Sequence, residues 1–275
     1  MTGPAGVRHS LPYTANLSIL FTELPLLERA EAARAAGFTA VEYWWPFDGA
    51  DPRPVEVERF VRSIEQAGVR LTGLNLFAGD MAAGERGLVS WVGREAEFAV
   101  SLTIAIGIAE RLGCRSFNAL YGNRLDGVAP SEQDALALEH LATAAEAAGK
   151  IGARLVLEPL SGTPAYPLKT AADAVAVMDR LGLDNVRLLA DLYHLAVNGD
   201  DLDSVIAGYT PRTGHVQIAD APGRHQPGTG ELDLEGHLEK LEAAGYRGHV
   251  GIEYKPDGPT LASLAWLPEE RRGDK

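Results

Sequence analysis

Cysteine is almost absent from this chain of 275 residues. Cys114 is the only cysteine, which excludes an intrachain disulfide and a zinc site built from cysteines. A chain without disulfides suits a reducing compartment. We therefore expect a cytoplasmic protein in which Cys114 is a small buried hydrophobic group.

Long hydrophobic runs are missing as well. No segment reaches the roughly 18 consecutive apolar residues of a membrane-spanning helix, and the opening MTGPAGVRHSLPY lacks the apolar core of a signal peptide. Positive charge is scarce, because 25 Lys and Arg face 38 Asp and Glu and leave a formal net charge of −13. Nucleic-acid binding needs concentrated Lys and Arg. We therefore expect a small substrate or a metal cation as partner, and neither nucleic acid nor membrane.

A repeated local pattern runs through the chain: an Ala-rich or Leu-rich amphipathic segment, a glycine, and a short apolar run. Glycine suits the left-handed position that follows a helix, and the apolar runs are short enough to be buried strands. The glycines are Gly37, Gly68, Gly113, Gly152, Gly182 and Gly245. The strands are expected near residues 14–19, 40–44, 70–76, 115–120, 154–159, 187–191, 214–218 and 249–254.

Two spacings predict helix starts between these strands. Ser131 with Asp134, and Thr170 with Asp173, place a hydroxyl three residues before an acid, as in a capping box. The eight repeated units predict an α/β protein with one domain over residues 1–275, a single (β/α)8 TIM barrel with flexible ends at 1–12 and 268–275. A doubly wound open sheet is the alternative, but no Gly-x-Gly-x-x-Gly sequence follows any expected strand.

Polar residues close the last four expected strands. Three runs end in Glu158, Asp191 and Glu253, and the seventh carries Gln217 near its end. The carboxyl ends of barrel strands meet at one mouth, so these four side chains are expected together. Unpaired carboxylates are costly in apolar surroundings, and Mg²⁺ or Mn²⁺, which prefer carboxylate and amide oxygens, would compensate them. The alternative for each acid is an Arg or Lys partner, or a cap on the next helix.

The chain resembles the hydroxypyruvate isomerases of the xylose-isomerase-like TIM-barrel superfamily over nearly its whole length. The resemblance is carried by GDMAAGERG at 79–87, HVQIADAPGRHQPGTGE at 215–231, and the motifs Glu158-Pro159, Asp191-Leu192-Tyr193-His194 and Glu253-Tyr254-Lys255-Pro256.

The resemblance implies a site and a reaction. The family's metal ligands fall on Glu158, Asp191, Gln217 and Glu253, and its acid and base on Glu158 and Glu253. Substrate contacts are expected from His194, from Arg224, which suits a carboxylate, and from Arg86 in a loop able to cover the mouth. The implied reaction interconverts hydroxypyruvate and tartronate semialdehyde through an enediolate, and the implied assembly is a homo-oligomer.

Departures from the family leave the substrate open. Ser161 stands where relatives often have Asn, and Tyr43-Trp44-Trp45 is bulkier than usual. A 2-oxo-tetronate isomerase remains an alternative, as does a ketose 3-epimerase, although epimerases usually add an acid soon after the fifth strand and none lies between Glu158 and Asp173. An AP-endonuclease-like nuclease and a non-catalytic sugar-binding barrel are more remote. Only one of Trp44 and Trp45 is expected to face the pocket, since adjacent strand residues point to opposite faces.

Overall fold

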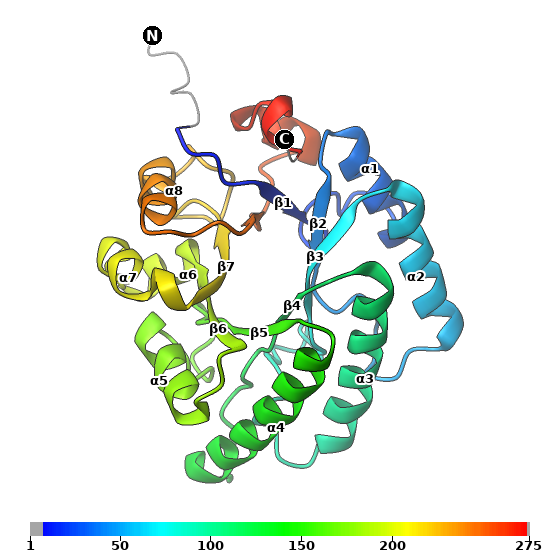
Figure 1. The fold of residues 1–275 in the computed structure, drawn as a ribbon, viewed down its shortest axis with the longest axis vertical. Coiled ribbons are helices and arrows are strands. Elements are labelled where there is room, and N and C mark those ends of the chain that lie inside the picture. The colour runs from blue at the N-terminus through cyan, green and yellow to red at the C-terminus, as the bar shows by residue number, and fades with distance from the viewer. Residues whose placement is uncertain (1–7, 274–275) are drawn as a thin grey trace.

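The structure, a computed structural model that describes residues 8–273, is a closed barrel of eight parallel strands (Figure 1). Each strand pairs with the next in the chain, and the last pairs with the first. The predicted (β/α)8 barrel is confirmed, and the open sheet is excluded. The strands are β1 (Tyr13–Asn16), β2 (Ala40–Tyr43), β3 (Arg70–Asn75), β4 (Ser116–Asn118), β5 (Arg154–Leu157), β6 (Val186–Asp191), β7 (Thr213–Ile218) and β8 (Val250–Ile252).

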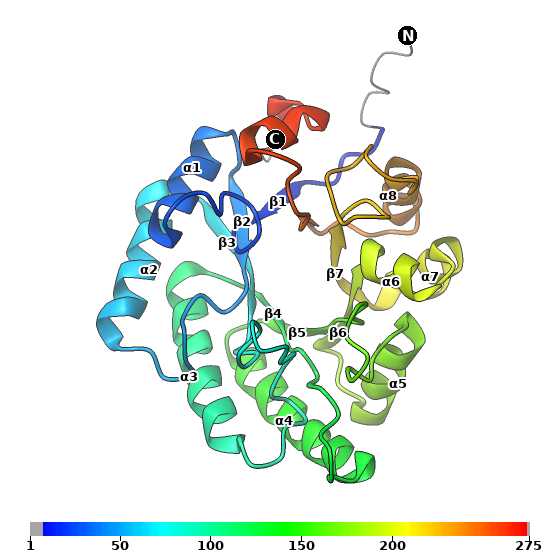
Figure 2. The ribbon, with the colours of Figure 1, turned by 180° about the vertical axis from the view of Figure 1, so that it is seen from behind.

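Helices surround the strands in both views of the ribbon (Figures 1 and 2). Within the described residues they are α1 (Arg29–Ala35), α2 (Pro54–Ala67), α3 (Glu95–Leu112), α4 (Pro130–Lys150), α5 (Ala171–Leu181), α6 (Leu192–Asn198), α7 (Leu202–Tyr209), α8 (Leu234–Ala243) and α9 (Thr260–Ser263). Short 3₁₀ segments lie at Leu26–Glu28, Thr210–Arg212, Leu264–Trp266 and Glu269–Arg271. None of the described helices is both long and apolar enough to cross a membrane.

Glycines end helices as the sequence pattern predicts. Gly68 and Gly113 follow α2 and α3 with φ of 65° and 71°, a left-handed conformation that costs glycine little. The helix start at Thr170 is also confirmed, because its side chain accepts the Asp173 N–H and the Asp173 carboxylate accepts the Thr170 N–H. These local signals fix where α2, α3 and α5 begin or end.

The predicted helix start at Ser131 is wrong. Helix α4 begins one residue earlier, at Pro130, and Ala129 occupies the capping position without a side-chain hydrogen bond. Proline favours the first helical position because its φ is already fixed and its missing N–H would have had no partner there. Asp134 is used elsewhere and accepts a hydrogen bond from the Tyr121 hydroxyl at 2.7 Å.

Both ends of the described chain contact the barrel. Leu11 is buried, and the Arg272 guanidinium donates to the backbone carbonyls of Ala36, Leu264 and Leu267. The described parts of the segments 1–12 and 268–275 are therefore anchored to the barrel. Residues 1–7 and 274–275, for which flexibility is also predicted, lie outside the described residues.

Cys114 is fully buried, as predicted, and burial raises the pKa of its thiol to about 11. It therefore behaves as a small apolar group before β4.

Candidate active site

The four predicted residues at the ends of β5 to β8 gather at one mouth of the barrel. Glu158 and Glu253 each lie one residue past a strand, Asp191 ends β6, and Gln217 lies in β7. All four are buried, with 1–4% of their surface exposed. The two glutamates line a cavity of about 410 Å³. Parallel strands bring these side chains together because their carboxyl ends share one edge of the barrel.

The predicted substrate-binding residues lie around the same cavity. Arg86 comes from the loop after β3, His194 from α6, and Arg224 from the loop after β7, and all three line the cavity. Arg86 is held in place by hydrogen bonds from its guanidinium to the carbonyls of Met81 and Glu85, at 2.9 and 2.6 Å. The structure thus brings the predicted substrate residues beside the buried acids.

Asparagines position the two glutamates, a feature that the sequence analysis misses. The amide of Asn118, at the end of β4, donates to Glu158 Oε2 at 2.6 Å. The amide of Asn16, at the end of β1, donates to Glu253 Oε2 at 2.6 Å. Each glutamate is therefore fixed by the neighbouring strand through one oxygen. The available signal was that three strands without a terminal acid, β1, β3 and β4, all end in asparagine.

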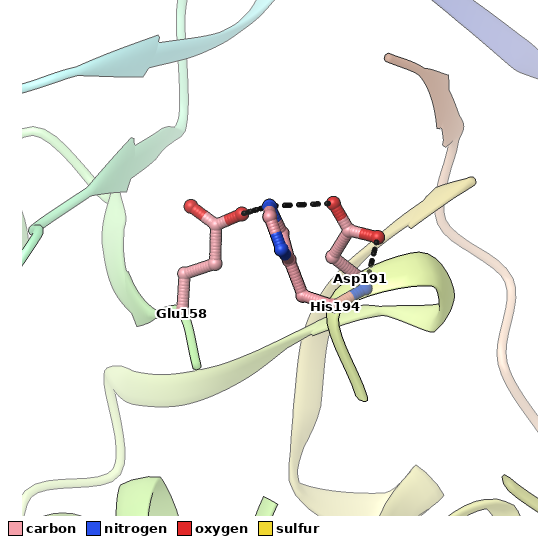
Figure 3. Close-up of side chains that lie close together, drawn as sticks. All are labelled: Glu158, Asp191 and His194. Atoms are coloured by element: carbon pink, nitrogen blue, oxygen red, sulfur yellow. Dashed lines mark hydrogen bonds and ion pairs between the residues drawn. The ribbon is translucent and has the colours of Figure 1, made fainter. Parts of the chain in front are cut away.

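Asp191 has two oxygens with different surroundings. Its Oδ1 caps α6 by accepting the N–H groups of Tyr193 and His194, at 2.8 and 3.3 Å. Its Oδ2 is buried and has no hydrogen-bond partner in the described part of the chain. Figure 3 shows the His194 ring between Asp191 and Glu158, with Nε2 3.8 Å from Asp191 Oδ2 and 4.0 Å from Glu158 Oε1.

These three side chains offer ligand atoms within 4.8 Å of one another, so they form a candidate metal site. The hydrogen bonds of His194 decide which of its nitrogens is free. The backbone N–H of Ser161 donates to His194 Nδ1 at 3.1 Å, and the Ser161 hydroxyl lies 2.7 Å from the same atom. Burial lowers the pKa of His194 to about 4, so the ring is neutral at pH 7. A neutral ring that accepts at Nδ1 carries its proton on Nε2, which makes Nε2 a hydrogen-bond donor.

We predict that ¹⁵N–¹H NMR of the metal-free protein near neutral pH will show His194 as the single tautomer protonated on Nε2. Among the described residues, His194 Nδ1 is the acceptor of the Ser161 N–H. If the proton moved to Nδ1, the two N–H groups would face each other. The signal is assigned by its loss in His194→Gln. Protonation at Nδ1, or an equal mixture of tautomers, would contradict this geometry.

Glu253 is the most heavily contacted acid of the site. The Arg224 guanidinium lies 2.5 Å from its Oε1, and the Trp44 indole N–H donates to its Oε2 at 3.2 Å. Trp45 instead donates to the carbonyl of Gly49, which confirms that only one of the two tryptophans faces the acids. The positive charge of Arg224 therefore lies directly against one of the two predicted catalytic glutamates.

A buried aspartate builds the loop that carries Arg224. Asp220 is fully buried, and its carboxylate accepts the backbone N–H groups of Ala221, Gly228 and Leu232 at 2.8–3.1 Å. Arg224 itself has φ of 60°, a left-handed conformation that costs a residue with a side chain roughly 1–2 kcal/mol. The surrounding hydrogen bonds hold this conformation, which points the guanidinium at the acids.

Replacing Asp220 with Ala should lower the free energy of unfolding by about 2–4 kcal/mol, because three buried N–H groups would lose their acceptor. Urea unfolding measures this loss, and hydrogen exchange should rise across residues 221–232. The exposed Asp257→Ala is the control and should change stability by less than about 0.5 kcal/mol. Equal stabilities of the two variants would show that Asp220 does not organise the loop.

The buried acids repel one another. Burial, together with the charges of Glu253 and Asp191, raises the pKa of Glu158 well above its usual value. Burial also raises the pKa of Glu253 to about 7, although the positive charge of Arg224 opposes this rise. A cluster in which the charged forms are disfavoured is typical of groups that exchange protons or bind a cation.

Comparison with known proteins agrees with this barrel. A sequence model of the xylose isomerase-like TIM barrel family matches residues 30–270. A crystal structure from Brucella melitensis, described as an AP endonuclease of family 2, is 35% identical and has a TM-score of 0.86 over 95% of this chain and 99% of that one.

Curated relatives carry isomerase names. A Streptomyces coelicolor protein with a provisional assignment as a hydroxypyruvate isomerase is 54% identical over 269 residues, covering 94% of this chain and 96% of that protein. The hydroxypyruvate isomerase of Escherichia coli is 35% identical over 263 residues, covering 95% and 100%. A 2-oxo-tetronate isomerase of Haemophilus influenzae is 32% identical over 257 residues, covering 93% and 97%.

The fold, the site and these matches define an isomerase of the xylose isomerase-like TIM barrel class. Within that class the chain belongs to the hydroxypyruvate isomerase family, as the sequence motifs predict.

Proposed function

We propose that this protein is a divalent-metal-dependent isomerase that interconverts hydroxypyruvate and tartronate semialdehyde. The observation that carries the proposal is a pair of buried glutamates, Glu158 and Glu253, that line one cavity from the ends of β5 and β8. Each has one oxygen held by an asparagine of the neighbouring strand, which fixes the carboxylate in the cavity. The activity for which the hydroxypyruvate isomerase relatives are named supports the choice of substrate.

The residues present fit a hard divalent cation. In and beside the acid cluster, three buried oxygens have no hydrogen-bond partner among the described residues: Asp191 Oδ2, Gln217 Oε1 and Asn118 Oδ1. Buried oxygens without a donor are costly, and Mg²⁺ or Mn²⁺ satisfies such atoms. We assign the ligand set to Glu158, Asp191, Gln217 and Glu253. His194 is left out of this set because its Nε2 carries a proton in the tautomer that Ser161 selects.

When bound, the cation would stabilise negative charge on the two adjacent oxygens of the substrate. The glutamates move the protons. Hydroxypyruvate has a carbonyl at C2 and a hydroxymethyl group at C3. One glutamate removes a proton from C3, and the electron pair of that C–H bond forms the C2–C3 double bond of an enediolate. The other glutamate delivers a proton to C2, and the proton of the O3 hydroxyl is transferred to O2, so O2 becomes a hydroxyl and the carbonyl ends at C3.

The cationic side chains hold the substrate in place. Arg224 suits the substrate carboxylate because its guanidinium is planar and permanently charged, and its Nε is buried without a partner in the described structure. His194 donates from Nε2 to a substrate oxygen. Arg86 lies at the rim of the cavity and contacts the substrate from the loop after β3.

A 2-oxo-tetronate is the second candidate substrate. It is longer by one hydroxymethyl group, the cavity of about 410 Å³ has room for it, and the Haemophilus influenzae relative carries this activity in its name. Both candidates require the same carboxylate contact and the same proton transfer. The tetronate has one more hydroxymethyl group, which we place beside Ser161 and Gly162 of the cavity lining.

Proton NMR in D₂O tests the proposal. Purified protein with Mg²⁺ or Mn²⁺ is incubated in parallel with hydroxypyruvate, a 2-oxo-tetronate, a ketose and a duplex containing an abasic site, each with an EDTA control. We expect metal-dependent formation of tartronate semialdehyde with deuterium at its C2. Turnover of the tetronate alone would change the substrate, and cleavage of the duplex without isomerisation would overturn the proposed function.

A further inference from the structure

A buried glutamate inside the barrel is not used by the proposed chemistry. Glu42 lies in β2 at a register shift between β2 and β3, and only 3% of its surface is exposed. Its Oε1 accepts hydrogen bonds from Gln217 Nε2 at 2.7 Å and from Asn16 Nδ2 at 3.2 Å. Its Oε2 is 2.7 Å from His215 Nε2. Glu42 therefore contacts Gln217, a proposed metal ligand.

Two amide groups link Glu42 to Glu253. Gln217 Nε2 donates to Glu42 Oε1 and to Glu253 Oε2, both at 2.7 Å. Asn16 Nδ2 donates to the same two oxygens, at 3.2 and 2.6 Å. An amide nitrogen has two hydrogens, so both hydrogens of Gln217 are used by carboxylates. A reversed Gln217 amide would place its carbonyl oxygen against two carboxylate oxygens.

This arrangement turns the carbonyl oxygen of Gln217 away from the two carboxylates and leaves it available to bind a cation. Gln217 Oε1 is buried and has no hydrogen-bond partner in the described residues. The contact with Glu253 alone would occupy one amide hydrogen, and Glu42 supplies the second acceptor. Glu42 thereby fixes which end of the amide is turned away from the carboxylates.

The surroundings keep Glu42 able to accept these bonds. Burial alone would raise the pKa of Glu42, but the charge and hydrogen bond of His215, with the bonds from Gln217 and Asn16, hold it below its usual value. The facing position in β8 is Gly251, where a Cβ would lie 2.6 Å from Glu42 Oε1 and 2.8 Å from Gln217 Cγ. The missing side chain at Gly251 thus leaves space for the contact between Glu42 and Gln217.

We propose that Glu42 is a positioning residue that keeps the carbonyl oxygen of Gln217 directed at the cation. The inference rests on the proposed function, because it requires that Gln217 binds the metal. Outer contacts of this kind fix the orientation of metal ligands and typically contribute about 10- to 100-fold to metal affinity.

The test is the dissociation constant of Mn²⁺, measured by electron paramagnetic resonance on the wild-type protein and on variants without substrate. E42L removes the acceptor and should weaken Mn²⁺ binding by about 10- to 100-fold. E42Q keeps an acceptor for Gln217 and can offer its NH₂ group to His215, so it should stay within about fivefold of wild type. The matched control is T72V, which removes a barrel hydroxyl bonded to Thr14 and to the Val41 carbonyl, and should bind as wild type does.

A double variant separates orientation from loss of the fold. In E42L/Q217E the second side chain is a carboxylate, which presents an oxygen whichever way it is turned, so Mn²⁺ affinity should recover to within about fivefold of wild type. Q217E alone should bind more weakly than the double variant, because its new carboxylate faces both Glu42 and Glu253, whereas in the double variant it faces Glu253 alone. Should E42L fold poorly, Gly251→Ala tests the same contact from β8 and should weaken binding.

The outcomes distinguish this inference from the proposed function. A wild-type protein that does not bind Mn²⁺ would overturn both. Tight binding by wild type with equal affinity in E42L, an E42Q variant as weak as E42L, or no recovery in E42L/Q217E would overturn the role of Glu42 alone.

Discussion

Replacing Glu253 or Glu158 with Gln should lower kcat for hydroxypyruvate isomerisation by about 10²- to 10⁴-fold, the usual contribution of a positioned acid or base. The amide has nearly the same size and can still accept the hydrogen bond from the neighbouring asparagine through its oxygen. The loss would therefore come from proton transfer and metal binding. Steady-state kinetics at saturating metal, with the Mn²⁺ affinity of each variant measured separately, divides the two contributions.

The exposed Glu146→Gln is the matched control for these variants. Glu146 is exposed on α4 and forms an ion pair with Lys150, so the Glu146→Gln variant should have the kcat of wild type. Deuterium exchange adds a second readout. The variant that keeps the base should still exchange the C3 hydrogen of hydroxypyruvate for deuterium in D₂O. Either glutamine variant with more than about a tenth of wild-type kcat would end its assignment as acid or base.

Asp191→Asn should weaken Mn²⁺ binding by at least about 100-fold while leaving the fold intact. Asn caps a helix about as well as Asp, so the substituted side chain should keep its oxygen on the N–H groups of Tyr193 and His194. Its NH₂ group must then occupy the position of Oδ2, where a donor cannot bind a cation. Isothermal titration with Mn²⁺ measures the loss, and thermal unfolding should change little.

A second capping aspartate provides the control for this variant. Asp201 caps α7 by accepting the Ser204 N–H at 2.8 Å and lies outside the cavity lining. Asp201→Asn should bind Mn²⁺ with wild-type affinity. Wild-type affinity in Asp191→Asn as well would remove Asp191 from the ligand set.

The barrel and the four acid and amide positions were predictable from sequence because their signals are local. A glycine soon after most of the described helices marks the repeated units. An acid at the end of an apolar run is recognisable in the sequence, and the barrel places the ends of its strands at one mouth. The family motifs then supplied the expected roles of His194, Arg224 and Arg86. Side-chain contacts across the barrel give no such local signal.

The residues that position the site were missed for this reason. Asn16 and Asn118 lie at the ends of their strands and carry uncharged amides. A search of the strand ends for metal-binding acids therefore passes over them. Glu42 lies within an expected strand, and whether its side chain faces the barrel interior depends on closure and register. Asp220 lies in a loop, where an acid is common, and only the folded loop shows three N–H groups directed at it.

The position of Mn²⁺, located by anomalous X-ray scattering from crystals of the wild-type protein, tests the account most directly. We predict an ion in the cavity bound by Glu158, Asp191 Oδ2, Gln217 Oε1 and Glu253, with His194 outside the ligand set. Manganese coordinated by His194 Nε2, or absent from the cavity at saturating concentration, would contradict the account.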